Sequence, residues 1–132
     1  MYFKSGRLSL LAALQNEKFS KEKYIILPAL ICDSVSKTLL NAGYKPLFVD
    51  VSLPDLSFEK SKFEEQFASK EVGAVLLVHF FGFINNISED LLELIKKKKC
   101  LIIEDWCHSI FPRQIKFKSD YAIFSYRKTL RC

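Results

Sequence analysis

Two segments in the second half of the sequence carry side chains that suit acid–base or nucleophilic chemistry. In CLIIEDWCHSIF, an apolar run leads into Asp105, and His108 follows three residues later. In DYAIFSYRKTL, Ser125 and Lys128 follow a second apolar run and are again three residues apart. A carboxylate at the end of a buried strand normally has a partner, because a buried charge without one is costly. Asp105 therefore marks a candidate site for a cation, a metal or a substrate.

Each of these side chains also has an ordinary structural explanation. Asp105 can cap the next turn or pair with a lysine, and His108 on its own would be a half-buried, hydrogen-bonded residue. Most lysines are solvated, but a desolvated Lys128 loses its proton more readily and becomes a nucleophile. Ser125 can bind an anion through its hydroxyl, and the neighbouring Arg127 suits a phosphate or a carboxylate. From the residues alone, several chemistries stay open.

The composition is that of one globular domain. Of the 132 residues, 49% are hydrophobic and 12 are Phe, while only four Gly and four Pro are present, so the chain can bury a core. The net charge is +5, but the lysines are scattered apart from residues 96–99. That run closes the segment SEDLLELIKKKK, whose acids come first and bases last, as in a helix that complements its own dipole. We therefore expect a solvated helix end there and no nucleic-acid partner.

The four cysteines, Cys32, Cys100, Cys107 and Cys132, form no recognised disulfide or metal pattern. Cys107, His108 and Cys132 are of the types that bind zinc, but their spacing matches no zinc motif, and we expect no bound metal. Unpaired thiols fit a reducing, cytoplasmic location. The longest apolar run, VGAVLLVHFFGFI, has 13 residues and is too short to span a bilayer, so we expect no membrane association.

Helix and strand patterns alternate along the chain. Asp33 is the expected N-cap of the second helix and Gly43 its expected stop. Because the expected strands lack strict polar alternation and are separated by helices, we predict an α/β fold with a mainly parallel sheet, covered on both faces as a three-layer α/β/α domain. We expect helices over residues 5–18, 33–43, 57–70 and 88–99, and strands over residues 24–30, 45–51, 73–82, 100–105 and 120–127.

Ligands of parallel sheets gather at the carboxyl ends of the strands. The expected strands place Asp50, His79, Asp105 and Ser125 at this edge. Glu104, next to Asp105 in an extended strand, is expected to point to the opposite face. The pattern thus predicts a polar site at one edge of the sheet without identifying its ligand.

The order of these segments resembles the DegT-type (DegT/DnrJ/StrS) sugar aminotransferases, which use pyridoxal 5′-phosphate (PLP) and share the fold of aspartate aminotransferase, fold type I. The resemblance covers almost the whole chain. It is carried by SGRLSLLAAL, by IILPALICDSVSKTLLNAGYKPLFVDV, by VGAVLLVHFFGFINNISEDLLELIKKKKCLIIEDWCHSIF with its VH-x-x-G and IIED-x-x-H strand ends, and by DYAIFSYRKTL. It implies that the three-layer domain is the large, cofactor-binding domain of such an enzyme.

The resemblance also implies a role for each candidate residue. Asp105 matches the aspartate that pairs with the pyridine nitrogen of the cofactor, and His108 matches a residue beside the ring. Lys128 matches the catalytic lysine that holds the cofactor aldehyde and moves protons. The phosphate-binding positions are matched by the Ser125 hydroxyl and by the helix-initiating turn of Gly6, Arg7 and Leu8.

The chain departs from the family pattern at three points. Lys128 follows Ser125 by three residues, where many members have five, and Arg131 stands where a shorter variant, FS-x-x-KTLP, has proline. Arg7 replaces the usual Thr or Ser after the first glycine. The turn ALICDS lacks the aromatic residue that commonly stacks on the cofactor ring.

The sequence ends at Cys132, whereas family members continue through more of the large domain and a C-terminal domain. We therefore expect residues 1–132 to be the N-terminal part of the PLP-binding large domain, with the C-terminal domain absent. The implied reaction moves an amino group from an amino-acid donor to a keto-sugar, typically nucleotide-linked. We expect it to be weak or absent in this chain alone, and we expect full-length members to be homodimers.

An alternative is a stand-alone signalling or binding module, such as a phospho-receiver domain, without PLP chemistry. The length and the α/β alternation fit, but a receiver has its acid pair after the first strand, and here the pair follows the fourth. A basic nucleic-acid-binding domain is a third alternative, and the sequence has no aromatic-interleaved basic strand or recognition helix to support it.

Overall fold

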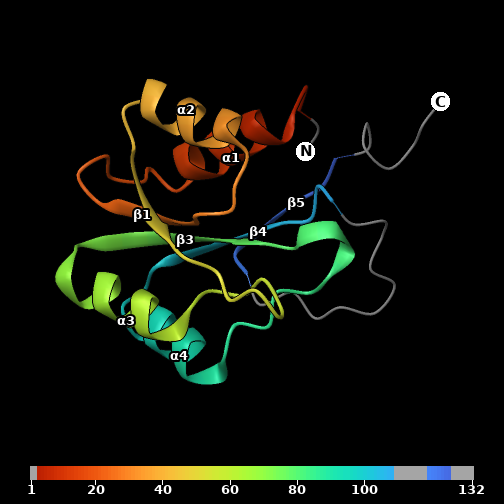
Figure 1. The fold of residues 1–132 in the computed structure, drawn as a ribbon. Helices are drawn as coiled ribbons and strands as arrows, with labels where there is room; N and C mark the ends of the chain where they lie inside the picture. Colours follow the sequence, from red (N-terminus) through yellow and green to blue (C-terminus); the bar gives the residue numbers. More distant parts are fainter. Residues whose placement is uncertain (1–2, 109–118, 126–132) are drawn as a thin grey trace.

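The computed structural model describes residues 3–108 and 119–125, which form a five-stranded sheet with helices on both faces (Figure 1). The helices are α1 (Gly6–Asn16), α2 (Asp33–Asn41), α3 (Lys60–Ser69) and α4 (Glu89–Lys97), with a short 3₁₀ helix, η1 (Phe80–Gly82). The strands are β1 (Tyr24–Pro28), β2 (Lys45–Val49), β3 (Val72–Val78), β4 (Leu101–Asp105) and β5 (Tyr121–Ile123). Within these residues, no helix combines the length and the apolar character that a membrane span needs.

The sheet has the order β2-β1-β3-β4-β5, and all of its strands run parallel. Helices α1 and α2 cover one face, and α3 and α4 cover the other (Figure 1). The predicted three-layer α/β/α architecture is therefore confirmed. The strand order reverses direction between β1 and β3, which is the switch point at which sheets of this kind bind ligands.

Two apolar cores, one on each face of the sheet, hold the layers together. Along β3, Ala74, Leu76 and Val78 belong to the core under α1 and α2, whereas Val75 and Leu77 belong to the core over α3 and α4. All five side chains are buried, so β3 is the apolar centre of the sheet, and its period-two alternation assigns each side chain to a layer. The same alternation sorts the polar side chains at the strand ends.

Three phenylalanines at the start of α3 and along it pack together. The Phe63 ring centroid lies 5.2 Å from that of Phe58 and 5.4 Å from that of Phe67. Phe58 precedes α3, which begins after Glu59, whose carboxylate accepts a hydrogen bond from the Lys62 N–H. This cap satisfies one of the free N–H groups at the start of the helix.

Several predicted boundaries are wrong, and two of these, the N-cap of α2 and the end of β3, lie at the carboxyl edge of the sheet. Cys32 is the N-cap of α2, and Asp33 is instead the first helical residue, where its charge favours the helix dipole and pairs with Lys37. The strand predicted over residues 73–82 ends at Val78, because the main chain turns into η1, where Phe81 has a φ of 52°. The predicted stop at Gly43 is confirmed by its φ of 82°, which glycine adopts without strain.

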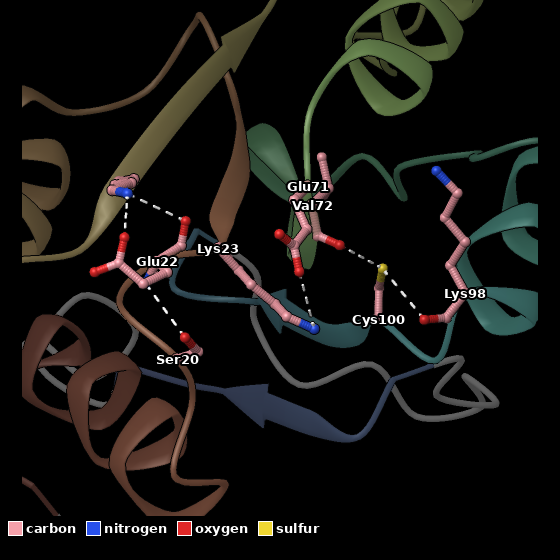
Figure 2. A network of polar contacts seen from close by, with 8 residues as sticks. Ser20, Glu22, Lys23, Glu71, Val72, Lys98 and Cys100 are labelled. Atoms are coloured by element: carbon pink, nitrogen blue, oxygen red, sulfur yellow. Dashed lines mark hydrogen bonds and ion pairs between the residues drawn. The ribbon is translucent and has the colours of Figure 1, made fainter.

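Polar contacts tie the loops together at the amino ends of the strands (Figure 2). Glu22 pairs with Lys45 at 2.8 Å and Lys23 with Glu71 at 3.8 Å, and the Cys100 thiol lies 3.2 Å from the Val72 carbonyl oxygen. The ion pairs are solvent-exposed and contribute little to stability, and burial raises the pKa of the Cys100 thiol. This edge is structural, and the candidate chemistry lies at the opposite one.

Phe63 provides a test of the packing on the α3 side. Phe63→Ala should lower the free energy of unfolding by about 3–5 kcal/mol, because the side chain is fully buried between two other rings. Urea denaturation followed by circular dichroism measures this change. Phe48→Ala is the matched control, since Phe48 on the edge strand is 47% exposed and should cost less than about 1 kcal/mol. Equal losses for the two variants would contradict the assignment of Phe63 to the core.

Candidate active site

A pocket lies at the carboxyl ends of the strands, on the face that α1 and α2 cover. It is bounded by the first turn of α1, by residues 31–35 after β1, and by the ends of β3, β4 and β5. Its lining includes Gly6, Arg7, Asp105, His108 and Ser125, so the fold brings together five of the residues singled out from the sequence.

Asp50 and His79, which the sequence also places at this edge, do not line the pocket, and neither does Leu8. Lys128 and Arg127 lie outside the described residues. Leu8 is described and lies on the outer side of the α1 turn, where its side chain is 44% exposed and its N–H donates to Ser5 Oγ at 3.4 Å.

Asp105 faces the pocket because it is the last residue of β4. Ile103, two residues earlier, belongs to the core under α1 and α2, so Asp105 leaves the strand on the same face. Its Oδ1 accepts a hydrogen bond from the Cys107 N–H at 2.8 Å, and its carbonyl oxygen accepts one from the His79 N–H at 3.0 Å. Both the side chain and the main chain of this acid are therefore held in place.

The first turn of α1 forms another wall. Ser5 is the N-cap of the helix, and Gly6 packs so closely on Cys107 that a Cβ at this position would lie 2.9 Å from Cys107 Sγ. Arg7 Nη1 donates to Ser34 Oγ at 3.0 Å across the pocket rim. The turn thus presents helix N–H groups and a guanidinium at one end of the pocket, an arrangement suited to an anion.

The turn after β1 supplies Ile31, Cys32, Ser34 and Val35 to the pocket lining. None of these is aromatic, in agreement with the sequence. The Cys32 sulfur lies 3.0 Å from Ser34 Oγ, beside the contact between Ser34 and Arg7. This wall is therefore made of aliphatic, thiol and hydroxyl groups.

The loop after β3 adds aromatic surface that the sequence analysis missed. The Phe81 ring lies 5.8 Å from the His108 ring, at an interplanar angle of 16°. Phe81, Phe83 and Ile84 are 72%, 68% and 47% exposed, respectively. A phenylalanine with positive φ is unfavourable, so the loop presents apolar side chains beside the pocket at an energetic cost. The signal in the sequence is the run HFFGFI, of which the apolar pattern places HFFG within the strand predicted over residues 73–82.

Glu104 and His79 lie on the other face of the sheet, next to α3 and α4. Glu104 is 3% exposed, as its expected direction implied, and its Oε2 accepts a hydrogen bond from Trp106 Nε1 at 3.0 Å. His79 stands at the carboxyl edge, but it is 2% exposed and does not line the pocket. Its Nδ1 accepts a hydrogen bond from the Asn85 N–H at 3.0 Å, and its Nε2 lies 3.9 Å from Glu104 Oε2.

His79 is neutral near pH 7. Burial lowers its pKa from 6.5 to about 4, because the imidazolium would lose its hydration. Since Nδ1 accepts the Asn85 N–H, the ring proton belongs on Nε2. The imidazole therefore acts as a packed, hydrogen-bonded ring rather than as a charged group.

Residues 3–108 and 119–125 contain no group of three or more His, Cys, Asp or Glu side chains that could hold a metal ion. Of the three residues noted in the sequence as possible zinc ligands, Cys107 and His108 border the pocket. Cys132 lies outside the described residues.

Comparisons with known proteins show which proteins this chain resembles. The model of the DegT/DnrJ/EryC1/StrS aminotransferase family matches residues 2–126. No functionally curated protein matches the sequence significantly.

Three solved structures illustrate the similarity. A DegT DnrJ EryC1 StrS aminotransferase from Brucella abortus is 21% identical, over 80% of this chain and 30% of that chain, with a TM-score of 0.69. The E. coli GDP-4-keto-6-deoxy-D-mannose-3-dehydratase with bound hydrated PLP is 24% identical, over 85% and 31% of the two chains, with a TM-score of 0.68. NtdA from Bacillus subtilis with the bound cofactor PMP is 23% identical, over 80% and 24%, with a TM-score of 0.66.

These structural matches establish the fold alone, because sequence identities this low do not show a shared function. The chain spans between 24% and 31% of the length of these three proteins. The predicted fold type I architecture of the large domain is thereby confirmed.

The pKa of His79 predicts a pH dependence of stability. The unfolded chain takes up a proton on this side chain near pH 6.5, and the folded chain only near pH 4. Between these values the unfolded state binds more protons, so the free energy of unfolding rises with pH, by about 3 kcal/mol in total from this residue. His79→Phe removes this contribution. The free energy of unfolding of the wild type, relative to that of His79→Phe, should therefore increase from pH 4 to pH 7. A difference that stays constant over this range would contradict the lowered pKa of His79.

The close approach of Gly6 to Cys107 predicts a coupling between the two residues. Gly6→Ala should destabilise the wild-type background by about 1 kcal/mol, because the added Cβ meets Cys107 Sγ. In a Cys107→Ala background the same substitution should be neutral or slightly stabilising. Denaturation of the four proteins closes the double-mutant cycle, and an equal effect in both backgrounds would show that the contact does not exist.

Proposed function

Because this chain belongs to the DegT/DnrJ/EryC1/StrS aminotransferase family, we propose that its pocket binds pyridoxal 5′-phosphate for amino transfer to a keto-sugar. The observation that supports this most directly is the pocket itself. It brings Asp105, Ser125 and the turn of Gly6 and Arg7 together at the carboxyl edge of the sheet, although they come from distant parts of the chain.

The side chains present suit the chemical groups of this cofactor. A glycine against Cys107 allows the main chain of the α1 turn to approach closely, and the helix N-terminus and Arg7 provide positive potential for a phosphate. Asp105 provides a fixed carboxylate for a ring nitrogen. When bound, pyridoxal 5′-phosphate acts as an electron sink for the carbon that carries the reacting amino group.

We assign the work of the chain's own residues as follows. Asp105 holds a proton on the pyridine nitrogen, because a nearby anion favours the charged form of that base. His108 lies beside the ring. Ser125 donates a hydrogen bond from its hydroxyl to the phosphate. The turn of Gly6, Arg7 and Leu8 directs the N-terminus of α1 towards the same group, and the hydrogen bond from the Leu8 N–H to Ser5 Oγ fixes this turn.

Lys128 is the proposed catalytic residue. Its amine would hold the cofactor through the aldehyde, with release of water, and would move a proton between the carbon that carries the reacting amino group and the cofactor. The family match ends at residue 126, two residues before Lys128, so this assignment is supported by the position of Lys128 three residues after Ser125 and by the segment DYAIFSYRKTL that contains both.

The proposed substrates are an amino-acid donor and a keto-sugar linked to a nucleotide. The GDP-linked keto-sugar in the name of the E. coli relative supports this class. We infer that residues 1–132 are the N-terminal part of the cofactor-binding domain and that the chain alone transfers amino groups weakly or not at all. Phe81, Phe83 and Ile84, exposed beside the pocket, fit an apolar contact with a second subunit of a homodimer. We place this enzyme in the cytoplasm.

Covalent trapping of the cofactor tests the proposal. The chain is incubated with pyridoxal 5′-phosphate and reduced with borohydride, and the modified lysine is located by peptide mass spectrometry. We expect modification concentrated on Lys128 and lost in Lys128→Arg, with at least about tenfold lower occupancy in Asp105→Asn, because the negative partner of the ring nitrogen is removed. Lys4, exposed at the pocket rim, serves as the internal control for random labelling. Labelling spread evenly over lysines would contradict the proposed site.

A further inference from the structure

Aromatic rings link the carboxyl ends of three adjacent strands. His79, Trp106 and Phe124 each stand one residue beyond the end of β3, β4 and β5, respectively. The ring centroids of His79 and Trp106 are 3.5 Å apart at 17°, and those of Trp106 and Phe124 are 6.5 Å apart at 15°. These three residues are termed the aromatic column.

Hydrogen bonds fix the column to the sheet. The Trp106 N–H donates to the Ile123 carbonyl oxygen at 2.8 Å, and its indole N–H donates to Glu104 at 3.0 Å. At the other end, His79 Nδ1 accepts the Asn85 N–H at 3.0 Å. His79 is 2% exposed and Trp106 1%, so both rings are enclosed.

Asp105 lies between two residues that this arrangement immobilises. Glu104 and Trp106 project from the opposite face of the strand and are bonded to each other, and the Asp105 carbonyl oxygen accepts the His79 N–H. A rotation of the strand end that moved Trp106 would therefore carry the Asp105 carboxylate out of the pocket. The column and the pocket are two faces of the same three strand ends.

We propose that His79 is a positioning residue: by stacking on Trp106 it fixes the end of β4 and thereby aims the Asp105 carboxylate into the pocket. The identity of the ligand that meets this carboxylate rests on the proposed function. The geometric role of His79 does not depend on that identity. A purely structural role would lower global stability without loosening this strand end selectively.

Four variants separate these roles. His79→Ala removes the stack, whereas His79→Phe keeps an aromatic ring on Trp106. Ile95→Ala, at a fully buried position of α4, is the matched control for a general loss of stability. Phe124→Ala truncates the 37% exposed end of the column and serves if His79→Ala fails to fold.

The first measurement needs no ligand. Amide hydrogen exchange at Cys107, whose N–H is bonded to Asp105 Oδ1, reports the fixation of the carboxylate. After correction for global stability, exchange should be about tenfold faster in His79→Ala than in Ile95→Ala, and about threefold faster in Phe124→Ala, with His79→Phe close to wild type. Equal corrected rates in His79→Ala and Ile95→Ala, or no change in Phe124→Ala where His79→Ala does not fold, would overturn the proposal.

The second measurement uses pyridoxamine 5′-phosphate, which binds without an aldehyde. Quenching of the fluorescence of Trp106, the single tryptophan of the chain, reports its affinity. We expect about tenfold weaker binding in His79→Ala and recovery in His79→Phe. Affinity in His79→Ala equal to that in Ile95→Ala would overturn the positioning role. No binding by the wild type would contradict the proposed function instead, and the exchange rates at Cys107 would still decide the role of His79.

Discussion

The pocket depends on the main-chain register at the end of β4. There, the bond from the His79 N–H to the Asp105 carbonyl oxygen and the pairing of Val78 with Asp105 keep β4 aligned with β3. Because side chains alternate along a strand, this register places Asp105 under α1 and α2 and sends Glu104 and Trp106 to the other layer. A slip of one residue would exchange the two faces, leaving Glu104 in the pocket and the shorter acid in the core.

Polar side chains at the strand ends are accommodated differently on the two faces of the sheet. On the pocket face, Asp105, Ser125, Arg7 and the start of α1 meet at a surface that a ligand can reach. On the other face, Glu104 and His79 are buried, and the cost is limited by the indole hydrogen bond to Glu104 and by the neutral state of the imidazole. This division explains how two adjacent acids can supply one carboxylate to the pocket, Asp105, and one to the buried structure, Glu104.

The sequence was sufficient for the architecture, because near-continuous apolar strands between amphipathic helices specify a covered parallel sheet. It also placed Asp105 and Ser125 at one edge. The sequence could not predict η1 or the burial of the His79 side chain. A short apolar run such as VHFFGFI has no periodicity that distinguishes a continuous strand from a strand followed by a turn. The strand order alone is shared with receiver-like domains, so the family match and the acid after β4, not the topology, support the proposed function.

The proposed contact between Asp105 and the ring nitrogen of a bound pyridoxal 5′-phosphate would set the protonation state of that nitrogen. The cofactor would be labelled with ¹⁵N in the ring, and its chemical shift would be measured by NMR near neutral pH in the wild-type chain and in Asp105→Asn. We expect a protonated nitrogen in the wild type and an unprotonated one in the variant. The same shift in both proteins would contradict the proposed contact.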